Sequence, residues 1–350
     1  MPGEIGEVVP RLITVSLPQM DASESPDFEF RQIWYAWGAQ NPQEGERFAK
    51  WLRRNKCGGP SVWHGHNFTS TVPPAKYFDT HPEYYALVKG KRTTTQLCTS
   101  NPDVVRLATE VANNYFDKNP NALAYSLCPD DNSDFCECPN CRALDSGLPD
   151  RYLKGKPDVT DRLMVFWNAV AEGVRQEHPD KYVTIYAYSN HTRPPSREKV
   201  HPGVLPVITT MNFCPLHSVD NLNCPSRQDL RRLISEWTQK ATKVYIYEYD
   251  PVVGWREVPC PLYGARAREM PIYKSLGVQG FSFEGHKSWA SNLPNYYIAA
   301  KMMWDSSQTL EALMRDFTDK FFGPAGPAML RRSGCRRRRV RGPARARGPE

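Results

Sequence analysis

Two adjacent carboxylates are the residues of this chain best suited to acid–base chemistry. Asp130 and Asp131 directly follow the apolar, β-rich run of residues 122–128. Neighbouring carboxylates raise each other's pKa, so that one can stay protonated near neutral pH and act as a general acid. The plainer alternative is that either aspartate only starts a loop or caps a helix. We predict Asp131 as the acid, with Asp130 as the second candidate.

Two glutamates near the ends of later β-rich runs are the candidates for the opposing group. Glu248 lies among tyrosines, and strand alternation puts it on the same side as Asp250. Glu284 precedes Gly285, whose missing side chain leaves room for a ligand. We predict that Glu248 or Glu284 acts as nucleophile or base opposite Asp131. The alternative for both is a buried structural carboxylate.

Aromatic, imidazole and amide groups end the other β-rich runs. Rings stack on the apolar faces of sugars, while polar groups take the hydroxyls, so this mixture predicts a carbohydrate site. Trp34, Trp37, Tyr188 and Trp289 would form the platform. His64 and His66 alternate on one run and could instead hold a metal for a metal-dependent hydrolase. The predicted substrate-binding residues are Trp34, Trp37, His64, His66, Tyr186, Tyr188, His191, Asn212, Asp250, His286 and Trp289.

A group of cysteines follows the acidic pair. Cys136, Cys138 and Cys141 form a Cys-x-Cys-x-x-Cys run, and Cys128 or a histidine could complete four ligands. This spacing is typical of a closed structural zinc site rather than a catalytic one. The alternative is a set of reduced thiols or one disulfide. We expect no cofactor to be required for catalysis.

The elements that must position these groups alternate along the chain. Amphipathic helical patterns separate eight β-rich runs, which implies parallel pairing and favours a (β/α)8 TIM barrel over a doubly wound sheet. Catalytic groups of such barrels lie at the carboxyl ends of the strands. The eight runs are residues 28–37, 61–66, 95–99, 122–128, 182–188, 204–211, 243–249 and 278–284.

Several sequence segments resemble those of the bacterial family of glycosidase-like barrels catalogued as domain of unknown function 4838. They are residues 81–87 (His-Pro-Glu-Tyr-Tyr-Ala-Leu) with 90–92 (Gly-Lys-Arg), 96–102 (Gln-Leu-Cys-Thr-Ser-Asn-Pro), 126–131 (Ser-Leu-Cys-Pro-Asp-Asp) with the cysteine run, and the segments Asn-Tyr-Tyr, Trp-Asp and Phe-Phe-Gly-Pro between 295 and 324. The resemblance covers about residues 26–329. It implies a (β/α)8 barrel related to alpha-glucuronidases and beta-hexosaminidases. Asn commonly precedes Asp131 in that family, so Asp130 departs from the pattern.

The net charge of +7 is concentrated at the end of the chain. Residues 331–350 hold nine arginines and one glutamate, or +8, which leaves −1 for residues 1–330. A near-neutral body argues against a nucleic-acid partner unless the tail is a genuine binding arm. The abrupt Arg/Gly/Pro/Ala composition is typical of a shifted reading frame, and we predict a disordered tail.

The chain is therefore expected to contain three parts: a lead-in over residues 1–26, a barrel over 27–330 and the basic tail over 331–350. No apolar run is long enough to span a membrane, and residues 1–17 lack the apolar core of a signal peptide, so we expect a cytoplasmic protein. The predicted function is glycoside hydrolysis by paired carboxylates. Carboxyl groups about 5–5.5 Å apart would retain the anomeric configuration, and groups about 6.5–9.5 Å apart would invert it. The alternative is a non-catalytic carbohydrate-binding barrel.

Overall fold

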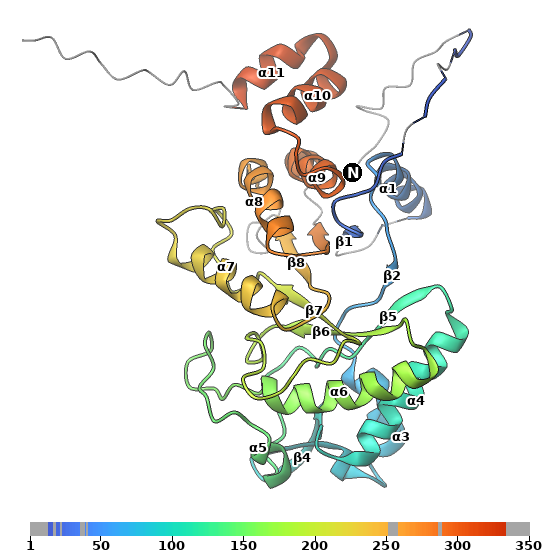
Figure 1. Cartoon of the computed structure of the whole chain (residues 1–350), viewed down its shortest axis with the longest axis vertical. Helices are drawn as coiled ribbons and strands as arrows, with labels where there is room; N and C mark the ends of the chain where they lie inside the picture. The colour runs from blue at the N-terminus through green and yellow to red at the C-terminus, as the bar shows by residue number, and fades with distance from the viewer. Residues whose placement is uncertain are drawn as a thin grey trace, which may run out of the picture.

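Seven parallel strands form the centre of the part of the protein that the structure describes (Figure 1). The computed structural model describes residues 13–16, 19–21, 23–35, 39, 41–250, 258–285 and 289–333. The strand order is β1-β9-β8-β7-β6-β5-β2. The strands are β1 (Phe30–Tyr35), β2 (Ser61–Val62), β5 (Ala122–Ser126), β6 (Tyr182–Ala187), β7 (Val204–Thr209), β8 (Tyr245–Asp250) and β9 (Gly280–Gly285).

The sheet curls into a nearly closed barrel. Arg31 of β1 and Gly58, which precedes β2, form an isolated antiparallel bridge with two N–H···O bonds of 2.9 Å. The backbones approach closely beside this bridge, since a Cβ at Gly59 would lie 2.0 Å from the carbonyl oxygen of Glu29. Gly59 also has a φ of +122°, which side chains disfavour. The sequence thus provides glycines where the first and last strands of the sheet meet.

The barrel is confirmed, but the predicted count of eight parallel strands is not met in the described residues. Residues 95–99, expected to be the third strand, overlap β4 (Lys91–Leu97), which pairs antiparallel with β3 (Tyr85–Val88) in a separate hairpin. Lys89 and Gly90 have positive φ and turn the chain back. The polar run from Lys91 to Thr95 is poorly suited to a position buried on both faces. In its place β2 pairs directly with β5.

Helices surround the sheet and bury one large apolar core. Helix α4 begins where the Asn101 side chain accepts hydrogen bonds from the backbone N–H groups of Asp103 and Val104. No helix in the described ranges is long and apolar enough to cross a membrane. The helices are α1 (Pro42–Arg54), α2 (Phe68–Thr71), α3 (Pro74–Tyr77), η1 (Pro82–Tyr84), α4 (Pro102–Lys118), α5 (Pro139–Ala143), α6 (Thr160–Glu177), α7 (Pro225–Thr238), α8 (Tyr263–Ser275), α9 (Trp289–Trp304), α10 (Leu310–Phe322), η3 (Gly323–Ala325) and α11 (Gly326–Arg332).

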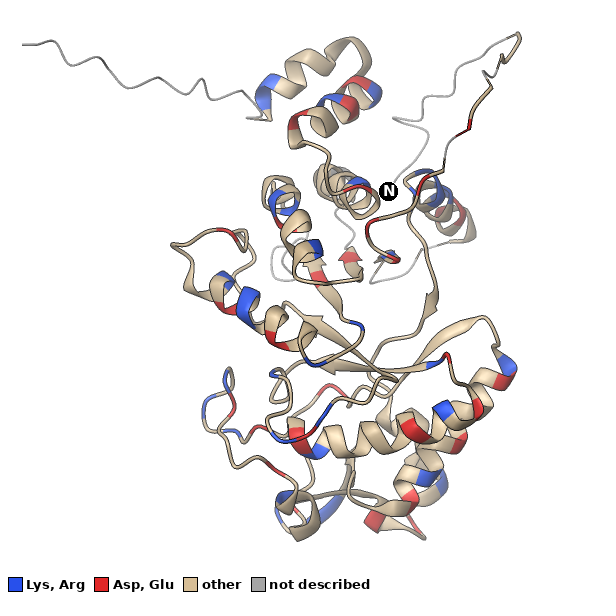
Figure 2. Cartoon of the chain, in the orientation of Figure 1, with Lys and Arg blue, Asp and Glu red and all other residues tan. Residues whose placement is uncertain are grey.

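Charges of both signs are interspersed along the helices, as Figure 2 shows. This agrees with the nearly neutral count for residues 1–330. Helix α11 continues through Arg331 and Arg332, so the first two residues of the predicted disordered tail are helical. Residues 334–350 lie outside the described residues.

Candidate active site

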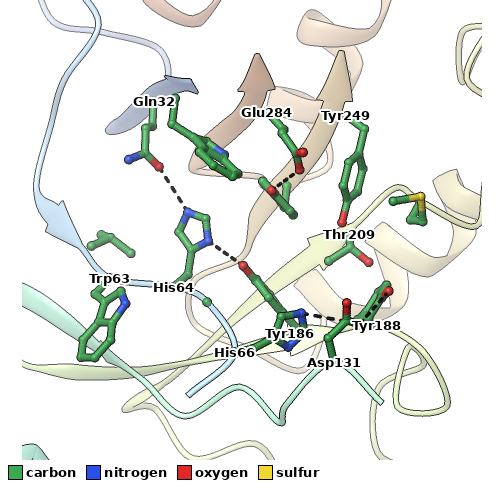
Figure 3. A pocket seen from close by; sticks show the side chains of 15 residues that line it. Gln32, Trp63, His64, His66, Asp131, Tyr186, Tyr188, Thr209, Tyr249 and Glu284 are labelled. Carbon is green, nitrogen blue, oxygen red and sulfur yellow. Dashed lines mark hydrogen bonds and ion pairs between the residues drawn. The ribbon is translucent and has the colours of Figure 1, made fainter. Parts of the chain in front are cut away.

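A cavity of about 540 Å³ opens at the carboxyl ends of the barrel strands (Figure 3). Its floor and walls come from six of the described strands (β1, β2, β6, β7, β8 and β9) and from the segments after β2, β5, β6 and β7, so residues far apart in sequence meet there. The lining residues are Gln32, Trp34, Val62, Trp63, His64, Gly65, His66, Asp131, Tyr186, Tyr188, Thr209, Met211, Tyr247, Tyr249 and Glu284.

Asp131 enters this cavity from the segment after β5. The Tyr188 hydroxyl donates a hydrogen bond of 3.2 Å to its Oδ1, and Nε2 of His66 lies 3.8 Å from the same oxygen. Burial, with Asp131 beside it, raises the pKa of Tyr188, so this phenol remains a donor at neutral pH. The Asp131 side chain is 66% exposed. A substrate can therefore reach its free carboxyl edge.

The neighbouring Asp130 points elsewhere. Its Oδ2 accepts a hydrogen bond of 3.0 Å from the Thr69 backbone N–H, and its own N–H donates to Gln96 Oε1 at 3.2 Å. Thr69 lies in the first turn of α2, so Asp130 binds a helix start rather than lining the cavity. Of the adjacent pair, the structure brings only Asp131 to the pocket.

Glu284 reaches the cavity from β9. The Tyr247 hydroxyl of β8 donates a hydrogen bond to Glu284 Oε2. Burial, and next the hydrogen bond to Glu284, raise the pKa of Tyr247, so the phenol keeps its proton and the glutamate is the acceptor. Figure 3 shows Glu284 and Asp131 directed at the same space from different sides of the barrel.

Glu248 faces the opposite side of the sheet. It is 3% exposed, accepts a 2.8 Å hydrogen bond from Thr210 Oγ1 and lies 3.1 Å from Arg266 Nη2. Arg266 is also 3.0 Å from Glu269, which pairs with Arg227. Glu248 thus belongs to a buried ionic cluster between the sheet and helices α7 and α8, away from the cavity.

The two histidines occupy different environments in the pocket. His64 hydrogen bonds through Nδ1 to the Tyr186 hydroxyl (3.0 Å) and through Nε2 to Gln32 Oε1 (3.2 Å). Burial lowers the pKa of His64 to about 4, so the ring is neutral at physiological pH. His66 Nδ1 lies 2.5 Å from the Pro129 carbonyl oxygen. In the described part of the chain, neither histidine belongs to a group of three or more metal-type ligands.

Aromatic rings line the space between the two carboxylates. Tyr247 lies nearly parallel to Tyr186 at a centroid distance of 5.9 Å and stacks on Trp34 at 6.2 Å. Sequence reasoning missed Tyr247 and Tyr249 as lining residues, together with Gln32, Trp63, Thr209 and Met211. The alternation Tyr245-Tyr247-Tyr249 was the available signal, because it places three rings on the face opposite Glu248.

Several predicted binding residues do not reach the cavity. Trp289 is fully buried against Phe48 and Trp51 in the core. His191 is 3% exposed, beside Phe135, and burial lowers its pKa to about 3. Asn212 is exposed and does not line the cavity. Trp37, His286 and the side chain of Asp250 lie outside the described residues.

Four buried cysteines gather near the hairpin. The sulfur atoms of Cys98, Cys136, Cys138 and Cys141 all lie within 4.8 Å of one another, a group that could hold a metal ion. Cys128 is not among them, which corrects the sequence prediction: its thiol faces the Thr184 carbonyl oxygen at 3.8 Å inside the barrel. Burial raises its pKa to about 12. The fourth member is Cys98, which follows β4.

Comparisons with known proteins agree with this architecture. The family model described as "Domain of unknown function (DUF4838)" matches residues 1–333. No curated protein matches the chain. A GH115 4-O-methyl-alpha-glucuronidase, BtGH115A, is similar in structure with a TM-score of 0.50 and 11% identity, over 89% of this chain and 44% of that one.

Two further structures superpose less well, with lower TM-scores. CpGH89 from Clostridium perfringens has a TM-score of 0.48 and 9% identity, over 85% of this chain and 39% of its own. Endo-glycoceramidase II from Rhodococcus sp. has a TM-score of 0.35 and 15% identity, over 74% of this chain and 65% of its own. The chain thus spans less than two thirds of each of these structures, and the likeness to BtGH115A concerns the fold.

Proposed function

Because the chain belongs to the DUF4838 family, whose description names no reaction, we propose from the pocket itself that this protein is a glycoside hydrolase. One observation carries the proposal: Asp131 and Glu284 enter one aromatic-lined cavity at the carboxyl ends of barrel strands. Paired carboxyl groups across a sugar-sized cavity are the machinery of most glycoside hydrolases. The barrel scaffold of BtGH115A, a glucuronidase, supports the same class.

Asp131 is the general acid in this proposal. Its exposed carboxyl edge can deliver a proton to the glycosidic oxygen, while Tyr188 and His66 hold the side chain in place. When the bond breaks, the leaving sugar takes the proton and Asp131 becomes the carboxylate. If Glu284 is the nucleophile, Asp131 recovers a proton from the water that completes hydrolysis; if Glu284 is the base, the proton that it takes returns to Asp131 through solvent.

Glu284 is the nucleophile or base. The Tyr247 hydroxyl donates a hydrogen bond to Glu284 Oε2 and so orients the carboxylate toward the cavity. As nucleophile it would bond to the anomeric carbon and be released by water; as base it would take a proton from the attacking water. Both carboxyl groups are regenerated, so the cycle uses no cofactor.

The pocket favours a neutral sugar. The described lining residues include two carboxylates and no lysine or arginine that would pair with a uronic acid. Trp34, Tyr186 and Tyr247 offer ring faces to the apolar side of a pyranose. Gln32 offers its side-chain amide to sugar hydroxyl groups, and His64 holds that amide through Nε2.

A panel of aryl glycosides tests the proposal, with neutral hexosides, N-acetylhexosaminides and glucuronides assayed in parallel. We expect release of the aryl group from a neutral glycoside, and loss of that release in Asp131→Asn and Glu284→Gln. The anomer of the first product, followed by NMR, distinguishes retention from inversion. Oligosaccharide binding without turnover, unchanged in Asp131→Asn, would instead assign a non-catalytic binding barrel. Full activity in Glu284→Gln would remove Glu284 from the mechanism.

A further inference from the structure

The four clustered cysteines come from two segments that lie outside the parallel sheet. Cys98 follows β4 of the hairpin, whereas Cys136, Cys138 and Cys141 lie after β5, at the start of α5. All four are at most 7% exposed. A set of four buried thiols from separate segments calls for a reason, since reduced thiols bind one another only weakly.

The spacing of the sulfur atoms matches a tetrahedral metal. Cys98 Sγ lies 3.8 Å from Cys138 Sγ and 3.9 Å from Cys141 Sγ. Four sulfurs about 2.3 Å from a central zinc ion would lie about 3.8 Å apart. A disulfide needs a separation of about 2.05 Å and would use only two of the four.

Hydrogen-bond donors surround the sulfur atoms. Backbone N–H groups of Leu87 and Cys141 donate to Cys136 Sγ (3.3 Å) and Cys138 Sγ (3.4 Å). Arg92 Nη1 lies 3.9 Å from Cys136 Sγ, and the Arg162 guanidinium donates to the Cys136 carbonyl oxygen. A zinc ion with four thiolates carries two negative charges, and Arg92 offsets part of that charge, whereas Arg162 is already paired with Asp145.

We propose that Cys98, Cys136, Cys138 and Cys141 bind one structural Zn²⁺. Four buried soft ligands close the coordination sphere, so the ion has no position for a substrate. A second group, Cys214, His217 and Cys224, offers only three ligands, and His217 is exposed. It is the competing location for any metal found in the protein.

The ion would fix the segment that carries Asp131. Gln96 Nε2 of β4 donates to the Asp130 carbonyl oxygen at 2.7 Å, and Asn132 Nδ2 donates to the Thr95 carbonyl oxygen at 2.9 Å. Zinc at the cluster would therefore hold the hairpin against residues 136–141. The two hydrogen bonds extend this contact to Asp130 and Asn132, the residues on either side of Asp131. This consequence for catalysis rests on the proposed function, whereas the metal site does not.

Metal content of the reduced, purified full chain tests the site. We expect one zinc per chain in the wild type and in the matched controls Cys128→Ser and Cys214→Ser, and almost none in Cys98→Ser. Cys128 is the control for a buried thiol, since it lies outside the cluster. A metal-free wild type, zinc retained by Cys98→Ser, or zinc lost from Cys214→Ser would each overturn the assignment.

Cobalt substitution in the wild type decides the question even if Cys98→Ser does not fold. Co²⁺ bound by four thiolates gives intense sulfur-to-cobalt charge-transfer and tetrahedral d–d absorption, and we expect both. An octahedral spectrum, or one with a histidine ligand, would overturn the proposal. We also expect removal of zinc by a chelator to speed hydrogen exchange in residues 127–141, a readout that needs no substrate.

Discussion

Glu248 and Glu284 lie on neighbouring strands of one sheet but face opposite sides of it. In the register between β8 and β9, Glu248 pairs with Phe283 and Tyr249 pairs with Glu284. Glu248 is closed off with Arg266 beneath the helices, whereas Glu284 meets Tyr247 in the cavity. Because side chains alternate along a strand, an offset of one residue separates a structural carboxylate from a candidate catalytic one.

A glutamate near the carboxyl end of a strand therefore cannot be assigned a catalytic role from its residue type and position alone. Both glutamates follow aromatic residues near the carboxyl ends of their strands. What differs is the set of partners: an arginine and a threonine hold Glu248, and a tyrosine holds Glu284. Each glutamate should therefore control a different measurable property.

The largest expected effect separates the two glutamates by activity. Glu284→Gln should lower kcat/KM on an activated glycoside by about 10³-fold, because the amide can neither attack nor accept the proton. Glu248→Gln is the matched control and should keep kcat within a few-fold, measured on folded protein. Equal losses in the two variants would contradict the assignment.

The reverse ordering is expected for stability. Glu248→Gln leaves Arg266 with Glu269 as its carboxylate partner, and we expect a loss of about 2–3 kcal/mol in the free energy of unfolding. Glu284→Gln should change it by less than about 1 kcal/mol, because this side chain lines an open cavity. Urea unfolding followed by tryptophan fluorescence measures both. A larger loss in Glu284→Gln would mean that the two faces are not divided in this way.

His64 lines the same cavity as Glu284, and we expect it to make the stability of the fold depend on pH. Its folded-state pKa of about 4 lies below the ordinary value of about 6.5. Between these values the unfolded chain binds more protons, so stability rises with pH through this window and is fully present above about pH 6.5. We expect the free energy of unfolding to rise by about 1–2 kcal/mol across this pH window because of His64, and we expect His64→Gln to abolish this rise. An unchanged slope of unfolding free energy between pH 4 and 6.5 in that variant would contradict it.

The smallest expected effect concerns the tyrosine that holds Glu284. Tyr247→Phe removes the hydroxyl that donates to Glu284 Oε2 and should lower kcat by about tenfold, because the carboxylate loses the hydrogen bond that orients it. Tyr245→Phe is the control, because the Tyr245 hydroxyl donates to Glu29, a residue that does not line the cavity. A loss of kcat of the same size in Tyr245→Phe would show that the effect is not specific to Glu284.

Sequence patterns predicted the barrel well because alternating β-rich and amphipathic runs are local signals. They did not predict the direct pairing of β2 with β5, since the hairpin of β3 and β4 depends on a turn at Lys89 and Gly90. Asp131 and Glu284, two of the predicted carboxylates, line the cavity, whereas Glu248 faces the other side of the sheet and pairs with Arg266 from α8, a contact that local sequence patterns do not reveal. Cys98 was missed because it lies 38 positions before Cys136 in the sequence, and only folding brings the two together.

The bridge between Arg31 and Gly58 has a consequence for how the cavity behaves. Around most of the barrel, neighbouring strands share extended backbone ladders, but β1 meets the β2 segment through this isolated bridge. The hydrogen bond between His64 Nε2 and Gln32 Oε1 also joins β1 to the segment after β2. Fewer backbone hydrogen bonds therefore hold β1 to the β2 segment than hold β8 to β9. We expect any widening of the cavity to occur between β1 and the β2 segment, while the spacing of β8 and β9 beneath Glu284 is kept by their continuous pairing.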